Sequence, residues 1–186
     1  MTLCRSAAML VSLVLVPLTV AAAPPPEPMV EYSADSTMQT EGGMTMKSRV
    51  YHTPTKQRME MGGADGSVTI IRKDKKVVWQ VMGDMYMEMP LDQSNAPDMG
   101  GFDIQEQTEV GEETVNGLKT TKTKIIATKP DGSKFGGFFW TTKEGVAVKM
   151  DLLSKDGDKK MRMASELTNV KIEKQNPALF EVPAGA

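Results

Sequence analysis

The segment that most constrains the fold is residues 77–90, which reads VVWQVMGDMYMEMP. Two apolar runs flank Gly83-Asp84, and glycine at the first central position suits a tight type II′ turn between antiparallel strands. A two-residue turn places Met82 opposite Met85, whereas a turn one residue longer would exchange the two faces of the hairpin. With the short turn, the alternation of side chains along a strand predicts one almost wholly apolar face. That face carries Val78, Gln80, Met82, Met85, Met87 and Met89, and the other carries Val77, Trp79, Val81, Tyr86 and Glu88.

Short alternating segments separated by turn-forming residues also fill the rest of the chain. A loop is predicted over residues 90–102, with one helical turn around residues 92–96, and residues 103–113 are compatible with a short helix or an edge strand. Further strands are predicted at residues 29–40, 44–52, 57–61, 68–72, 118–128, 135–142, 146–153 and 159–172. This spacing predicts a mainly β protein, with about ten strands in one strongly curved antiparallel sheet or half-open β-barrel and short helical segments. A looped or helical tail over residues 176–180 is expected to place Leu179 and Phe180 on the body of the domain.

Residues 1–22 have the pattern of a secretory signal peptide. Arg5 precedes an apolar run over residues 7–16, and Val20-Ala21-Ala22 supplies the small residues that a signal peptidase reads. We place cleavage after Ala22, with Ala21 or Ala23 as alternatives, followed by a Pro-rich leader over residues 23–28 and one β domain over residues 29–183. The other interpretation, a retained membrane anchor, is disfavoured because the run is short for a spanning helix and no basic cluster follows it.

The composition of the mature chain excludes several classes of function. Cys4 is the only cysteine and precedes the apolar run, so it cannot serve as a lipidated cysteine, and the mature chain has no thiol for disulfides, metal binding or catalysis. Removing Arg5 changes the formal charge from −2 to −3, and no basic run stands out, so nucleic acid is not expected as a partner. We therefore expect an unlipidated periplasmic protein with no integral membrane span after cleavage; its oligomeric state is open.

Three further segments carry a family resemblance. They read GEETVNG at residues 111–117, WTTKEG at residues 140–145 and LFEVPAG at residues 179–185. Together with the secretion signal and the strands between Tyr32 and Met89, they resemble poorly characterised bacterial domains of the lipoprotein-sorting type. Those domains are similar to the Lol periplasmic lipoprotein carriers and to the lipid-sensing domain of a sigma-factor regulator. The resemblance implies a half-open β-barrel with an apolar concave face, closed by short helices, that binds acyl chains or lipidated proteins.

Methionines in alternating positions are the strongest functional signal in the chain. They have three interpretations: core packing, because Met fills irregular gaps; a cavity lining that adapts to variable acyl chains; or a thioether site for Cu(I) built from more than one strand. We predict the cavity, with a lipid or a lipidated protein as partner, and keep a copper-binding protein and a structural envelope protein with a closed core as alternatives. The predicted ligand-binding residues are Met44, Met46, Met59, Met61, Val78, Met82, Met85, Met87 and Met89.

Catalytic signals are weak by comparison. His52 is the single histidine, and we expect it on the surface beside a turn, since alone it forms neither a dyad nor a histidine metal site. No pair of carboxylates stands out, so we predict a non-enzymatic protein without a cofactor or a metal site. Trp79 and Trp140 are either core residues or residues at a cavity rim, and the core is favoured because large aromatic side chains dominate β cores.

Overall fold

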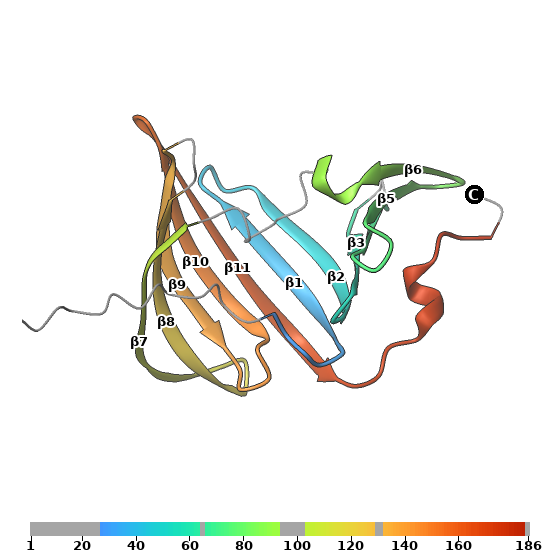
Figure 1. Ribbon diagram of the computed structural model, residues 1–186. Coiled ribbons are helices and arrows are strands. Elements are labelled where there is room, and N and C mark those ends of the chain that lie inside the picture. Colours follow the sequence, from blue (N-terminus) through green and yellow to red (C-terminus); the bar gives the residue numbers. More distant parts are fainter. Residues whose placement is uncertain (1–26, 64–65, 94–102, 129–131, 185–186) are drawn as a thin grey trace, which may run out of the picture.

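The computed structural model describes residues 27–63, 66–93, 103–128 and 132–184 as one antiparallel sheet of eleven strands. The strand order is β6-β5-β4-β3-β2-β1-β11-β10-β9-β8-β7. Figure 1 shows that the sheet curves strongly around β1 and β11 and does not close, which confirms the predicted fold class. The strands are β1 (Tyr32–Thr40), β2 (Thr45–Thr53), β3 (Lys56–Met61), β4 (Val68–Arg72), β5 (Val77–Met82), β6 (Met85–Pro90), β7 (Asp103–Val115), β8 (Leu118–Thr128), β9 (Lys134–Thr141), β10 (Ala147–Asp156) and β11 (Lys159–Ile172).

The β5–β6 hairpin has the predicted two-residue turn. Met82 pairs with Met85, and Val78 pairs with Met89 at the base of the hairpin. Gly83 has a φ of 60°, while Asp84 is not among the described residues with positive φ, as a type II′ turn requires. The predicted register, and therefore the predicted division of this hairpin into two faces, is confirmed.

Two segments left open by the sequence are partly settled. The acidic segment from residue 103 is an edge strand, β7, rather than a helix, and it brings the number of strands to eleven. The helical turn predicted around residues 92–96 is described only as a 3-10 turn, η1 (Leu91–Gln93), and residues 94–96 lie outside the described part. The predicted signal peptide, and all of the leader except Glu27 and Pro28, also lie outside it. Among the described residues, no helix has the length and hydrophobicity needed to cross a bilayer.

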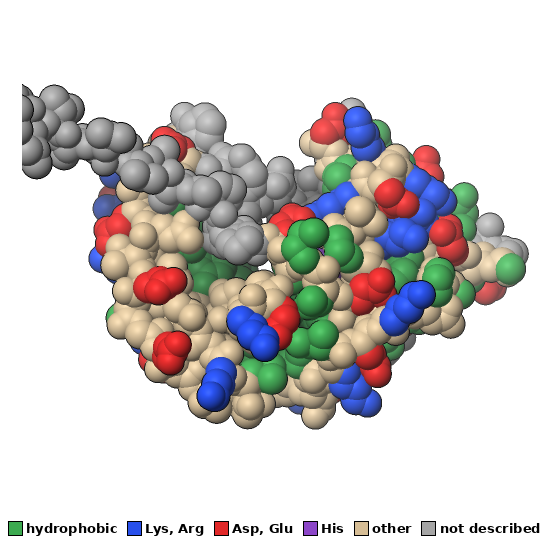
Figure 2. Space-filling model, turned by 60° about the horizontal axis from the view of Figure 1, so that its bottom comes forward, with side chains coloured by type: hydrophobic (Ala, Val, Ile, Leu, Met, Phe, Trp, Pro, Cys, Tyr) green, Lys and Arg blue, Asp and Glu red, His purple; other side chains and the backbone are tan. Residues whose placement is uncertain are grey.

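Pairing across the sheet defines two faces. The inner face, on the concave side, carries mostly apolar side chains, whereas the outer face carries most of the ion pairs. The inner face includes Ala34, Met38, Met46, Val50, Met59, Met61, Val78, Ile125, Phe135, Phe139, Leu152 and Met163. Figure 2 shows hydrophobic side chains in the hollowed centre of the molecule and charged side chains on the surface around it.

The C-terminal segment packs on the outer face of the part of the sheet formed by β2–β6, which we call the smaller arm. A 3-10 turn, η3 (Pro177–Phe180), contacts β3 and β4, and Figure 1 shows it outside the curve of the sheet. Phe180 is 1% exposed and packs with Ile70, Trp79 and Val81. The prediction that this tail would place Leu179 and Phe180 on the body of the domain is confirmed.

Arg72 fastens this segment to the sheet. Its side chain is 4% exposed, and its guanidinium donates to the Phe180 carbonyl at 3.0 Å and to both carboxylate oxygens of Asp74 at 2.8 Å. The hydrogen bond from Arg72 lowers the pKa of Asp74 to about 2. The Asp74 carboxylate therefore stabilises the fold above its unfolded pKa, and this contribution is lost as the pH falls towards 2.

Asp74→Asn is expected to remove this pH-dependent stabilisation. At neutral pH the variant should unfold at a lower urea concentration than the wild type, since a neutral amide pairs less strongly with the guanidinium. Urea titrations at several pH values between 7 and 2 should show the two midpoints converging below pH 4, the usual range of a free Asp. A midpoint difference that stays constant down to pH 2 would contradict this role of Asp74.

Candidate functional site

The register brings most of the predicted ligand-binding residues onto the inner face. Met46 lies on β2, where it pairs with Met38, and the two methionines of β3 pair with Val50 and Ser48 of the same face. The remaining predicted residues follow on β5 and β6. Met44 is different, because it lies in the turn before β2 and is 64% exposed. The residues that share the inner face are Met46, Met59, Met61, Val78, Met82, Met85, Met87 and Met89.

Exposure increases along this face from the base of the β5–β6 hairpin to its tip. Val78 is 2% exposed and Met89 is half-buried, whereas Met87 is 51% and Met85 is 69% exposed. Met82, opposite Met85, is 46% exposed. The base of the hairpin is thus packed like a core, while its tip presents thioether side chains to solvent.

The larger arm of the sheet, formed by β7–β11, supplies a second apolar part of the inner face. Ile125, Phe135, Phe139 and Leu152 form one buried cluster, and Met150 and Met163 pack against it as partly buried neighbours. The ligand-binding residues predicted from the sequence include none of them. The sequence did contain their alternation, but only the pairing of β1 with β11 joins the two arms into one face.

His52 corrects one prediction from the sequence. It is 7% exposed rather than on the surface, and its ring stacks on Tyr32 with ring centroids 5.0 Å apart. The physical reason is the β1–β2 register, which places Tyr32 directly opposite His52 on the inner face. Its Nδ1 atom lies 3.3 Å from the Val30 carbonyl oxygen, and burial lowers its pKa. Burial also raises the pKa of Tyr32 to about 12.

Both tryptophans are buried residues of the outer face rather than residues at a cavity rim. Trp79 is 6% exposed, and its Nε1 atom donates to Glu88 at 2.7 Å. Trp140 is 5% exposed and donates to Glu113 at 2.7 Å, which lowers the pKa of that carboxyl. These hydrogen bonds satisfy the indole groups locally. Trp140 also belongs to a buried cluster that includes Ala34 and Leu167.

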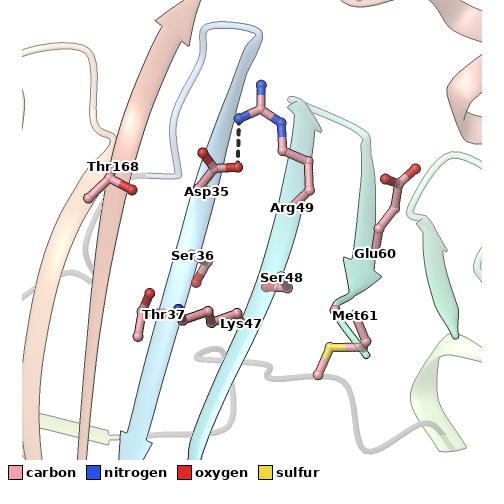
Figure 3. Close-up of a pocket in the computed structure, with 10 residues that line it drawn as sticks. Asp35, Ser36, Thr37, Lys47, Ser48, Arg49, Glu60, Met61 and Thr168 are labelled. Atoms are coloured by element: carbon pink, nitrogen blue, oxygen red, sulfur yellow. Dashed lines mark hydrogen bonds and ion pairs between the residues drawn. The ribbon is translucent and has the colours of Figure 1, made fainter. Parts of the chain in front are cut away.

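A polar pocket of about 530 Å³ lies over β1, β2 and β3 (Figure 3). Its charged side chains belong to the outer face, where Asp35 pairs with Arg49 and Glu60 pairs with Arg58. Arg49 donates to Asp35 at 2.9 Å and to Ser33 at 3.0 Å, while Asn169 donates to Asp35 at 2.7 Å. The bonds from Asn169 and then from Arg49 lower the pKa of Asp35. Ser48 and Met61 of the inner face also line the pocket, and its best-defined contact is the Arg49–Asp35 ion pair.

Comparison with solved structures shows which known fold this sheet has. MucB matches with a TM-score of 0.57 and 11% identity, over 86% of this chain and 59% of the MucB chain. MucB in complex with MucA(peri) matches with a TM-score of 0.54 and 14% identity, over 85% of this chain and 56% of that chain. This chain thus spans less than two thirds of the MucB chains that it matches.

Looser matches include a putative outer membrane lipoprotein-sorting protein domain from Vibrio parahaemolyticus, with a TM-score of 0.42 and 9% identity over 82% of this chain and 89% of that chain. No family model matches the sequence, and no curated protein matches it. The likeness to MucB is therefore a likeness of fold: the chain has a half-open β-barrel fold like that of MucB.

Proposed function

We propose that this protein is a non-enzymatic periplasmic binding protein whose inner face holds the acyl chains of a lipid or of a lipidated protein. The observation that carries the proposal is the row of exposed methionines, Met82, Met85 and Met87, beside a buried apolar face. When a ligand covers exposed apolar surface, the free energy falls by about 0.8 kcal/mol for each buried methylene group. Methionine suits chains of variable length because it is unbranched and flexible.

The comparison with MucB supports a binding function. MucB, which has this fold over part of its chain at low sequence identity, forms a complex with MucA(peri), so a protein that contains this fold can bind a protein partner. A free lipid and a lipidated protein both carry an acyl chain, which is the narrow, flexible, apolar group that this inner face would recognise. Lipidated protein and free lipid are therefore the two ligand sources that the proposal includes.

Met87→Asp is expected to reduce binding of a fluorescent fatty-acid analogue by at least about tenfold, since a charge disfavours an apolar ligand on its surface. The protein should remain folded, because Met87 is 51% exposed and a carboxylate there can keep its hydration. Fluorescence titration and thermal unfolding measure the two effects separately. Two controls are matched to it: Met87→Leu keeps the volume, and Tyr86→Asp places the same charge on the opposite face of β6.

Each outcome of this comparison has a defined meaning. Binding lost in Met87→Asp but kept in both controls supports a ligand site on the inner face. Unfolding of Met87→Asp supports a closed core at this position, and equal binding in all variants contradicts the proposal. Native mass spectrometry of gently purified protein tests the ligand class: co-purified lipid supports the proposal, whereas retained Cu(I) supports the thioether alternative.

A further inference from the structure

The methionines on and beside the β5–β6 hairpin differ in their access to solvent. Met82, Met85 and Met87 are 46%, 69% and 51% exposed, on one face of adjacent strands. Met46, Met59, Met61, Met89 and Met163, on the same face of the sheet, are only partly exposed. These three accessible thioethers thus form one group at the tip of β5–β6, continuous with more protected ones at its base. Met29, Met44 and Met161 are the other exposed methionines among the described residues.

We propose that the tip methionines Met82, Met85 and Met87 are a site of reversible oxidation to methionine sulfoxide that switches off ligand binding by the inner face. The consequence for binding rests on the function proposed above, whereas the selectivity of oxidation does not. The oxidant class is a hypohalous acid, and the reaction that we test is with hypochlorous acid. Methionine sulfoxide reductases reverse this modification.

The reaction is balanced without any further reactant. The thioether sulfur of methionine gives up an electron pair, hypochlorous acid supplies the oxygen atom, and an S–O bond forms as the O–Cl bond breaks. Sulfur loses two electrons, chlorine gains two to become chloride, and the proton of hypochlorous acid is released to water. The product is a sulfoxide, which is polar and chiral where the thioether was flexible and apolar.

The exposed positions of the tip methionines explain why their oxidation would affect binding without unfolding the protein. The tip side chains are about half exposed or more, so a sulfoxide oxygen there can remain hydrated and need not be buried in the core. A ligand that covers this face would have to remove that water from a polar group which an acyl chain cannot satisfy. We therefore expect affinity for the fatty-acid analogue to fall by at least about tenfold, with the melting temperature nearly unchanged.

The first test maps oxidation by mass spectrometry after graded treatment of the folded protein with hypochlorous acid. One oxygen should be added to Met82, Met85 and Met87 before Met59, Met61 and Met163, and this order should disappear in urea-denatured protein. Equal rates at tip and base in the folded protein would overturn the inference. This result does not depend on any ligand, so it stands or fails separately from the proposed function.

The second test uses a triple variant, Met82→Leu, Met85→Leu and Met87→Leu, that keeps the volume of the tip but offers no sulfur there. Met29, Met44 and Met161, 78%, 64% and 57% exposed, remain in it as oxidisable methionines outside the hairpin. Each protein is compared with its own affinity before treatment. Oxidation should weaken binding by the wild type at least about tenfold, and methionine sulfoxide reductase should restore it, whereas the affinity of the triple variant, whatever its starting value, should not change on oxidation. Loss of binding in the oxidised triple variant, or full binding in oxidised wild type, would refute the switch. If unoxidised wild type does not bind the analogue, the proposed function itself fails.

Discussion

Gly137→Ala should prevent the protein from folding stably, with a loss of at least about 4 kcal/mol in the free energy of unfolding. A Cβ atom at this position would lie 2.0 Å from the Asp151 carbonyl oxygen and 2.9 Å from the Leu152 Cα atom. Both are backbone atoms of β10, the strand that pairs with β9 here, so no side chain can move aside to relieve the clash. The two strands would have to separate in the middle of the larger arm.

The adjacent glycine provides a matched control. A Cβ atom on Gly136 would lie 3.5 Å from the Ile125 carbonyl oxygen, which is an ordinary contact. Gly136→Ala should therefore stay within about 1 kcal/mol of the wild type. Circular dichroism and urea unfolding of both variants measure the difference, and a Gly137→Ala protein as stable as Gly136→Ala would show that β9 and β10 do not approach this closely.

Phe180→Ala is expected to cost about 3–5 kcal/mol, the usual range for a buried phenylalanine that leaves a cavity. Phe180 is 1% exposed against Ile70 and Trp79 of the outer face. The backbone on both sides of the cavity is held in place, because Arg72 donates to the Phe180 carbonyl and Arg58 donates to the Leu179 carbonyl at 3.0 Å each. These bonds limit collapse of the segment into the space that the ring leaves.

Leu179→Ala is the control for this second prediction, since Leu179 is only partly buried. It should cost clearly less than Phe180→Ala in urea unfolding at neutral pH. A cost below about 1 kcal/mol for Phe180→Ala would mean that the C-terminal segment adds little to the fold. Because this segment lies on the outer face, molecules of either variant that remain folded should bind the fatty-acid analogue like the wild type.

Local sequence patterns were sufficient to predict most strands and one hairpin. The β5–β6 register followed from Gly83-Asp84 and from strict alternation, both of which are properties of neighbouring residues. The last strand, Lys159–Ile172, was predicted with the bounds that the structure has. By contrast, residues 103–113 were ambiguous, because two register shifts in the pairing of β7 with β8 break the period of two on which a strand prediction depends.

Long-range pairing decided the features that concern function. β1 pairs with β11, and this contact between the two ends of the domain joins two apolar stripes into one inner face. It also leaves both tryptophans on the outer face, and the β1–β2 register buries His52 against Tyr32. The alternation of side chains along a strand determines which residues share a face, but it does not determine which side of a curved sheet that face occupies. That side depends on how all eleven strands pair and curve together, so only the tertiary structure determines which methionines are packed and which are open to solvent.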